Sequence, residues 1–160
     1  MGGPTDKDTA RWHTKVRQLY DYWKRLHPAD GVLPGRQHFD PLDIAELMPL
    51  VWMVDIIRDQ PAPRFRYRLL GTRHVRAMTR DDTGRWMDEA HDDFRNSAVY
   101  PHYLDVARGE VSWRRGRPGF HVDPNYYEIE RVMLPMARNP AVVDMILAIT
   151  VYFDRKGNVV

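Results

Sequence analysis

The chain has 160 residues, of which 43% are hydrophobic and 29% charged, a composition that predicts one globular domain and excludes wholesale disorder. The net charge of +2 is too small to indicate nucleic-acid binding without a clustered basic patch. There is no cysteine, which excludes disulfides, thiolate metal sites and cysteine nucleophiles. The sequence shows no signal peptide and no apolar run of membrane-spanning length, so we expect a cytoplasmic protein.

The N-terminal region is predicted to begin with a disordered tail over residues 1–8, followed by a helix over residues 9–28. Apolar side chains in this helix recur at spacings of three and four and share one face: Trp12, Val16, Leu19, Tyr20 and Trp23. That face is more apolar than a solvent-facing helix would carry. It either folds back onto the chain's own core or packs against a second copy.

Residues 40–49 are predicted to form a short helix, because Asp40 is a good N-cap and Pro41 suits the first turn. Its buried side would consist of Leu42, Ile44 and Leu47. The apolar run "LVWMVDII" at residues 50–57 predicts a buried strand. In residues 64–70 apolar and basic side chains alternate, with Phe65, Tyr67 and Leu69 predicted inward and Arg64, Arg66 and Arg68 outward. The two strands form a predicted antiparallel hairpin.

The middle of the chain is predicted to be helical in short pieces. Thr72 can cap a helix over residues 75–78, residues 85–89 form another brief segment, and a helix runs from about residue 92 to residue 108. Pro101 inside that last helix predicts a kink or a late start. Three strands complete the chain, at residues 110–118, 126–137 and 145–153. Hairpin-like connections on both sides of a helical middle indicate an α+β fold with an antiparallel sheet.

This order of elements resembles that of PAS domains, and the sequence is similar to a family of short, single-domain bacterial PAS proteins. The similar stretches are "LYDYW" (residues 19–23), "FDPLDI" with "LMP" (39–49), "FRYRLLGT" (65–72), "TGRWMDE" (83–89) and "VMLPM" (132–136). The resemblance implies a PAS-like domain over residues 36–155, with a five-stranded antiparallel sheet, a helical connector on one face and an N-terminal flanking helix. The chain has Thr79 and Asp82 where the family tends to have a glycine and an apolar residue, so we expect local backbone and packing differences there.

The resemblance also implies a sensory or regulatory role, exercised through a small molecule, a signalling partner or dimerisation. Because PAS-like proteins commonly dimerise through flanking helices, we expect a homodimer formed by the apolar face of residues 9–28. The resemblance places the arginine-bearing strand 64–70 at a sheet edge, where long charged side chains discourage pairing with other sheets. Binding of an anion or a partner is the alternative for these arginines.

A ligand pocket, if present, would lie between the sheet and the helical middle. Its candidate residues are Tyr67, Trp86, Met87, His102, Tyr103, Tyr127 and Arg131. If the strand face that bears Arg131 points inward, its guanidinium could hold a carboxylate or phosphate; if it points outward, Glu128 and Glu130 would point in. A single bulge exchanges the two faces, so both orientations stay open. The aromatic candidates could equally be ordinary core residues.

Other chemistry finds little support in the sequence. Trp113 precedes a basic cluster of Arg114, Arg115 and Arg117. Nucleic-acid binding is not predicted, because acidic residues flank the cluster and no nucleic-acid-binding signature is present. We expect a solvated hairpin or a docking surface for an acidic partner. The seven histidines show no metal-binding spacing. Some PAS sensors bind haem iron through a histidine on the helix that carries His102; a structural histidine is the simpler interpretation, and no cofactor is predicted.

An enzyme is not predicted, because the sequence lacks a nucleophile motif and a phosphate-binding glycine loop. We therefore expect a sensory or regulatory PAS module that binds a small molecule, a signalling partner or both, with its output in trans. The alternative is a pure protein-interaction and dimerisation module whose core is filled and which binds no ligand.

Overall fold

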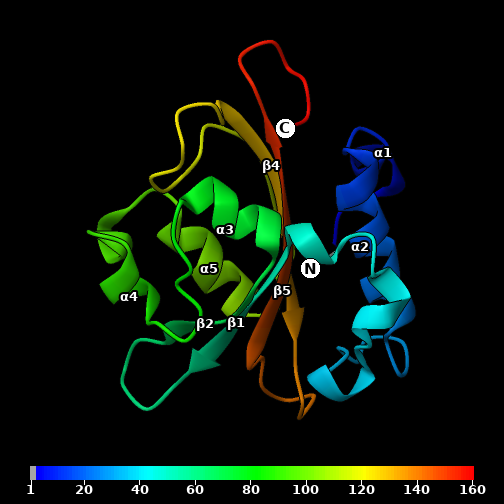
Figure 1. Cartoon of the computed structure of the whole chain (residues 1–160). Coiled ribbons are helices and arrows are strands. Elements are labelled where there is room, and N and C mark those ends of the chain that lie inside the picture. Colours follow the sequence, from blue (N-terminus) through cyan, green and yellow to red (C-terminus); the bar gives the residue numbers. More distant parts are fainter. Residues whose placement is uncertain (1–2) are drawn as a thin grey trace.

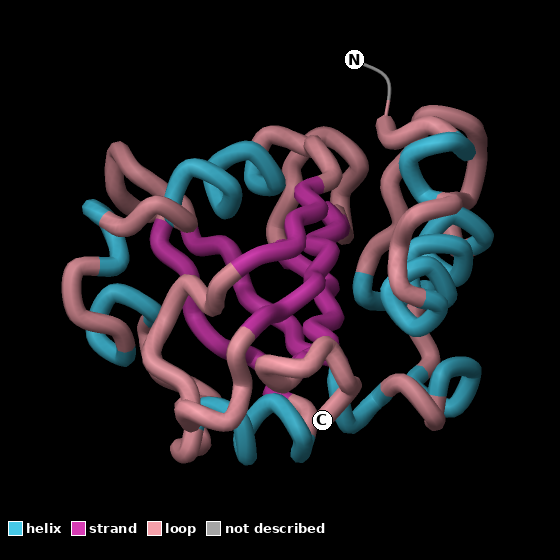
Figure 2. Tube along the Cα trace, turned by 90° about the horizontal axis from the view of Figure 1, so that it is seen from above, coloured by secondary structure: helices cyan, strands magenta, loops and turns pink. Residues whose placement is uncertain are grey.

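The structure, a computed structural model, describes residues 3–160. An antiparallel sheet divides the molecule, with the helical connector on one face and the N-terminal segment on the other (Figures 1 and 2). The strand order is β2-β1-β5-β4-β3. The strands are β1 (Val51–Ile57), β2 (Arg64–Leu70), β3 (Ser112–Gly116), β4 (Glu128–Met136) and β5 (Met145–Phe153). The predicted α+β fold with a five-stranded antiparallel sheet is confirmed.

The α-helices are α1 (Asp6–Thr9), α2 (Thr14–Arg25), α3 (Thr72–Met78), α4 (Met87–Ala90) and α5 (Tyr100–Ala107). The 3₁₀ helices are η1 (Arg36–His38), η2 (Pro41–Ile44), η3 (Met48–Leu50) and η4 (Phe94–Asn96). Pro101 occupies the first turn of α5, so the long helix starts late, one of the two outcomes that the sequence predicts.

Two local predictions are wrong. Residues 6–8 of the expected tail are helical and form α1 together with Thr9, because Thr5 and Asp8 make a capping box that satisfies the first backbone N–H groups; residues 1 and 2 lie outside the described part. Residues 40–49 form two 3₁₀ turns instead of one helix, although Asp40 does cap the first of them. The tighter winding leaves Leu42 82% exposed, while Ile44 and Leu47 are buried as expected.

A β-bulge changes the predicted alternation in β2. Met53 pairs with Leu69 and Val54 pairs with Tyr67, so Arg68 is an extra residue between them. Phe65 and Tyr67 therefore pack on the connector face, whereas Leu69 packs on the face of the N-terminal segment. The sequence alternation continues through the bulge but the side-chain direction does not, which is why the sequence alone misplaces Leu69.

The N-terminal helix folds back onto the sheet of its own chain. All five side chains expected at a dimer interface, Trp12, Val16, Leu19, Tyr20 and Trp23, are buried there, each at most 7% exposed. Trp12 also stacks on Trp113 of β3, with ring centroids 5.7 Å apart, and the indole N–H of Trp23 donates to the carbonyl of Pro135 at 2.9 Å. Of the two alternatives for this apolar face, the structure contains the intramolecular one, so these side chains are not available to a second copy while α2 is docked.

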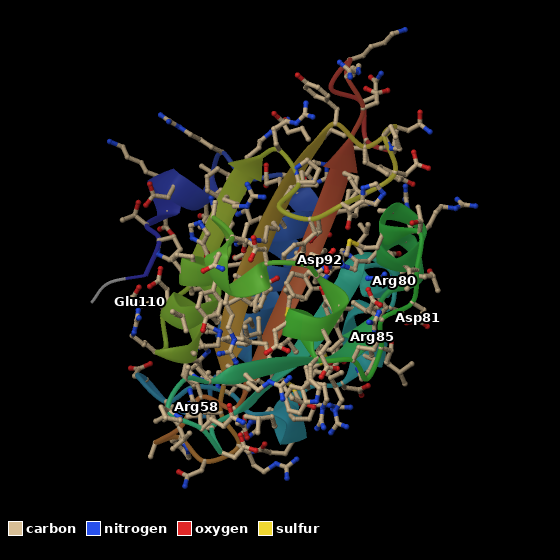
Figure 3. The ribbon with its side chains drawn as sticks, turned by 90° about the vertical axis from the view of Figure 1, so that its left-hand side faces the viewer. Arg58, Arg80, Asp81, Arg85, Asp92 and Glu110 are labelled. Carbon is tan, nitrogen blue, oxygen red and sulfur yellow. The ribbon has the colours of Figure 1, made fainter. Side chains whose placement is uncertain are left out.

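Thr79 and Asp82, the two departures from the family pattern, have different local consequences. Thr79 ends α3 in the left-handed conformation, with a φ of 62°, and its hydroxyl donates to the carbonyl of Met78. Glycine adopts this conformation without strain, but the branched Cβ of threonine does not. The carboxylate of Asp82 is buried, and Arg80 and Arg85 each bind it at 2.7 Å. Figure 3 shows both arginines on this edge of the connector.

We predict that Trp23→Ala lowers the free energy of unfolding by about 3–5 kcal/mol, because it removes a buried indole and leaves a cavity beneath α2. Urea unfolding measures the loss, and Gln18→Ala, an exposed change in the same helix, is the control. Light scattering should give the same mass for both variants and the parent protein. A change of mass with unchanged stability would place Trp23 between two copies instead.

We predict that Thr79→Gly raises the free energy of unfolding by about 1 kcal/mol, because glycine relieves the left-handed strain. Thr79→Ala removes the same hydroxyl but keeps a Cβ, so it should stabilise much less. Both values come from chemical unfolding curves. Equal gains from the two variants would show that the strain does not arise from the Cβ.

Candidate ligand pocket

A small cavity of about 50 Å³ lies between the sheet and the helical connector. Every strand contributes to its floor, through Trp52, Tyr67, Arg114, Ile129, Arg131, Thr150 and Tyr152. Its walls come from α3, α5 and the loop after β3, through His74, Met78, Val99, Tyr103, Pro118, Gly119, Phe120 and Val122. Since roughly 10–15 Å³ of such space holds one water, the cavity has room for about three to five atoms of that size.

The charged part of the floor is a row of side chains across three neighbouring strands. Arg114 on β3 lies opposite Arg131 on β4, and Arg131 lies opposite Thr150 on β5. The Arg131 face therefore points toward the connector. Glu130, its neighbour in the chain, points to the opposite face and accepts a hydrogen bond from the backbone N–H of His13 at 2.6 Å. This answers the question of orientation that the sequence left open.

Arg131 is buried without a compensating carboxylate. Its Nη1 donates to the carbonyl and to the hydroxyl of Ser112, at 3.0 and 3.1 Å. Its Nη2 is buried and has no hydrogen-bond partner among residues 3–160. Burial lowers the pKa of Arg131 to about 10, and Arg114 nearby adds to the decrease. The guanidinium stays protonated at neutral pH, so the cavity carries a positive charge.

Two tyrosine–histidine pairs join the floor to the connector. The hydroxyl of Tyr67 is hydrogen-bonded to Nε2 of His91, and the hydroxyl of Tyr152 to Nδ1 of His74, both at 2.6 Å. Burial lowers the pKa of His74 to about 3 and that of His91 to about 4, so both rings are neutral at pH 7. Burial also raises the pKa of both tyrosines, which keeps their hydroxyl groups protonated.

The loop after β3 separates the cavity from an open hollow of about 510 Å³. Both are lined by Met78, Gly119 and Phe120, so they adjoin. Phe120 stacks on His91, with ring centroids 3.9 Å apart. A Cβ on Gly119 would come within 2.4 Å of Val99, so the loop approaches the connector as closely as only glycine allows. The loop is the wall between the cavity and the hollow.

The cavity lies between the sheet and the helical connector, where the sequence resemblance led us to expect a ligand pocket. A family model described as a PAS domain matches residues 11–147. The chain belongs to the PAS domain family. Comparisons with curated proteins and with solved structures found no significant match. The match includes the N-terminal helix, which in this PAS domain covers the sheet face opposite the cavity.

Three of the seven residues expected at the pocket line the cavity of this PAS domain: Tyr67, Tyr103 and Arg131. His102, on α5, does not line it, although the positive charges of Arg131 and Arg114 add to the effect of burial in lowering its pKa. Arg114 was not expected in the pocket, because its basic neighbours in the sequence indicated a solvated cluster. The register shows instead that Arg114 lies opposite Arg131, whereas Arg115 lies opposite Glu130.

The other three expected residues lie elsewhere for identifiable reasons. Met87 is fully buried in the core between sheet and connector. Trp86 lies beneath the edge arginines, with the guanidinium carbon of Arg64 4.1 Å from its ring centroid. The ring of Tyr127 lies under Arg117, at 4.0 Å. The core thus encloses Met87, and a guanidinium lies over each of the two rings that were expected to contact a ligand.

The arginines of β2 lie at the sheet edge, as the resemblance implies, and are neutralised by nearby acids. Arg64 forms a two-point contact with the carboxylate of Asp88, at 2.7 and 3.0 Å. Arg66 and Arg68 lie 3.6 and 3.7 Å from Asp55 on β1. The basic cluster after Trp113 is also divided, because Arg115 pairs with Glu128 at 2.7 Å while Arg114 lines the cavity. Neither group is a continuous basic surface.

Haem does not fit this PAS domain. A porphyrin is far larger than a cavity of about 50 Å³, and His102 does not line that cavity. Within residues 3–160 no group of three or more histidine, aspartate and glutamate side chains is arranged to hold a metal ion. Every helix in the same range is too short or too polar to cross a bilayer.

We predict that the PAS domain loses roughly 1–2 kcal/mol of stability between pH 6.5 and pH 5 through His74 alone. Its folded pKa of about 3 lies below the unfolded value of about 6.5, so the unfolded chain takes up the proton first as the pH falls. His91 acts in the same direction. Stability is therefore complete above pH 6.5 and decreases below it, as urea unfolding at several pH values would measure.

His74→Gln should flatten this pH dependence, and His121→Gln, in an exposed loop, should leave it unchanged. An unchanged slope in His74→Gln would contradict the assignment of the effect to the buried ring.

Proposed function

We propose that this PAS domain is a sensory or regulatory module that binds a small molecule in the cavity between its sheet and its helical connector and acts through a signalling partner. The single observation that carries the proposal is the buried guanidinium of Arg131, whose Nη2 has no partner within residues 3–160. A charge in such a position costs free energy. A ligand that accepts hydrogen bonds from it would offset this cost. The role is one of binding, with no catalytic residue assigned.

The alternative, an interaction module with a filled core and no ligand, does not explain why Arg131 is buried beside a cavity. A protein-interaction module of the same fold would be more stable with an apolar residue at the position of Arg131. The cavity beside it would also be filled, since empty space within a core is destabilising. The charge and the space occur together, which favours a binding site.

The sheet offers a route from the cavity to the N-terminal helix. Successive residues of β4 point to opposite faces, so Arg131 lines the cavity while Glu130 binds the backbone of His13. Farther along β4, the carbonyl of Pro135 accepts the hydrogen bond from Trp23. A ligand that favours one arrangement of β4 would thereby change how α2 is docked, and a partner protein would recognise the difference.

Thermal denaturation with a panel of organic acids, amino acids, nucleotides and aromatic metabolites tests the proposal. A ligand at 100 times its dissociation constant should stabilise the protein by about 2.7 kcal/mol. Val122→Phe, which places a ring in the cavity wall, should abolish the shift. The same substitution at the exposed Val142 should preserve it.

If no compound in the panel stabilises the parent protein, the sensory proposal is wrong and the filled-core alternative is favoured. If a compound stabilises the parent protein and Val122→Phe equally, it binds elsewhere. Light scattering with and without a stabilising compound would show whether binding also promotes the homodimer that the sequence resemblance implies.

A further inference from the structure

The two arginines of the cavity form a pair that sheets normally avoid. Arg114 and Arg131 are directly opposite each other on β3 and β4, and like charges in that position destabilise a sheet. Nε of Arg114 and Nη2 of Arg131 are both buried, and neither has a hydrogen-bond partner in the described range. Two donors on adjacent side chains thus lack an acceptor.

The neighbouring pair on the other face of the same strands is matched in charge. Arg115 lies opposite Glu130, with Nη1 3.6 Å from its carboxylate, and also donates to Glu128 at 2.7 Å. The strands β3 and β4 therefore supply carboxylates to an arginine on one face and none to the two arginines in the cavity. No carboxylate of residues 3–160 pairs with either arginine on the cavity side.

We infer that the cavity binds a short monocarboxylate, whose carboxylate group accepts hydrogen bonds from Arg131 and Arg114. This inference rests on the proposed function and names its ligand class. Guanidinium groups match the planar geometry of a carboxylate. Thr150, which follows Arg131 in the row across the sheet, accepts a hydrogen bond from Trp52 at 2.9 Å, so its own hydroxyl hydrogen can also be directed at the anion.

The walls of the cavity favour a monocarboxylate over inorganic phosphate. The next row of the floor consists of Ile129 and Tyr152, and Met78 and Val122 lie above. An acid with a short carbon chain places its charged end on the arginines and its apolar end in these surroundings. A phosphate ion is polar on every side, and the apolar wall would leave part of it without hydrogen bonds. A volume of about 50 Å³ admits at most about two atoms beyond the three of the carboxylate.

Titration calorimetry with sodium propionate, at constant ionic strength in sodium chloride, tests the inference. Propionamide has the same shape without the charge, and inorganic phosphate has the charge without the carbon chain. We expect binding of propionate, with propionamide and phosphate at least tenfold weaker. Octanoate, with the same carboxylate and a longer chain, should also bind at least tenfold more weakly.

Three variants locate the site. Arg131→Met and Arg114→Gln should each weaken propionate binding at least tenfold, while Arg138→Gln, an exposed change after β4, should not alter it. Without propionate, Arg131→Met should melt at the same temperature as the parent protein or higher, because it removes a buried charge that has no carboxylate partner. Arg114 is only partly buried, so Arg114→Gln keeps the test valid if Arg131→Met does not fold.

Equal binding of phosphate and propionate would show a general anion site and overturn the inference, as would propionate binding that survives both arginine substitutions. Another outcome is that propionate does not bind while a compound of another class stabilises the parent protein but not Val122→Phe. In that case the ligand class is wrong and the proposed function stands. If no compound binds, both are wrong.

Discussion

Burial of the sheet on both faces is the constraint on which the rest of this structure depends. Every residue of β5 and all but the first of β4 are buried, so alternate side chains of one strand serve two separate cores. An antiparallel sheet usually exposes one face, and here the N-terminal segment covers the second. The helix α2 is consequently part of the domain's core, and its aromatic face needs no other partner to be buried.

Because the central strands have no exposed face, each charged side chain on them requires its own compensation. Glu130 is fully buried: its Oε2 accepts from the backbone N–H of His13, and its Oε1, which has no hydrogen-bond partner within residues 3–160, lies 3.6 Å from Nη1 of Arg115. The connector solves the same problem at Asp82 with two arginines. Arg131 has hydrogen bonds only to Ser112, and no carboxylate. Glu130 therefore lies beside an opposite charge, whereas Arg131, which lines the cavity, has none, and this difference favours a binding site at Arg131.

The order and type of the strands could be predicted because apolar runs and alternation are local signals. Residues 50–57, 64–70 and 145–153 form strands close to these limits. Two of the errors came from geometry that leaves no local signal. The bulge at Arg68 exchanges the faces after it, and 3₁₀ winding exposes Leu42. In the pocket, Tyr67, Tyr103 and Arg131 could be found from the resemblance, but Trp52, His74 and Tyr152 could not, because each also suits an ordinary core.

The elements, their order, the family resemblance and the apolar face of the first helix follow from the sequence, since all of these depend on residues close together in the chain. The surface that covers this face and the direction of Arg131 are set by the tertiary structure. It also decided that Arg114, seventeen positions away, is its neighbour. The physical reason is register: residues on different strands meet according to the hydrogen-bond pairing of the sheet, and a shift of one residue reverses every side chain.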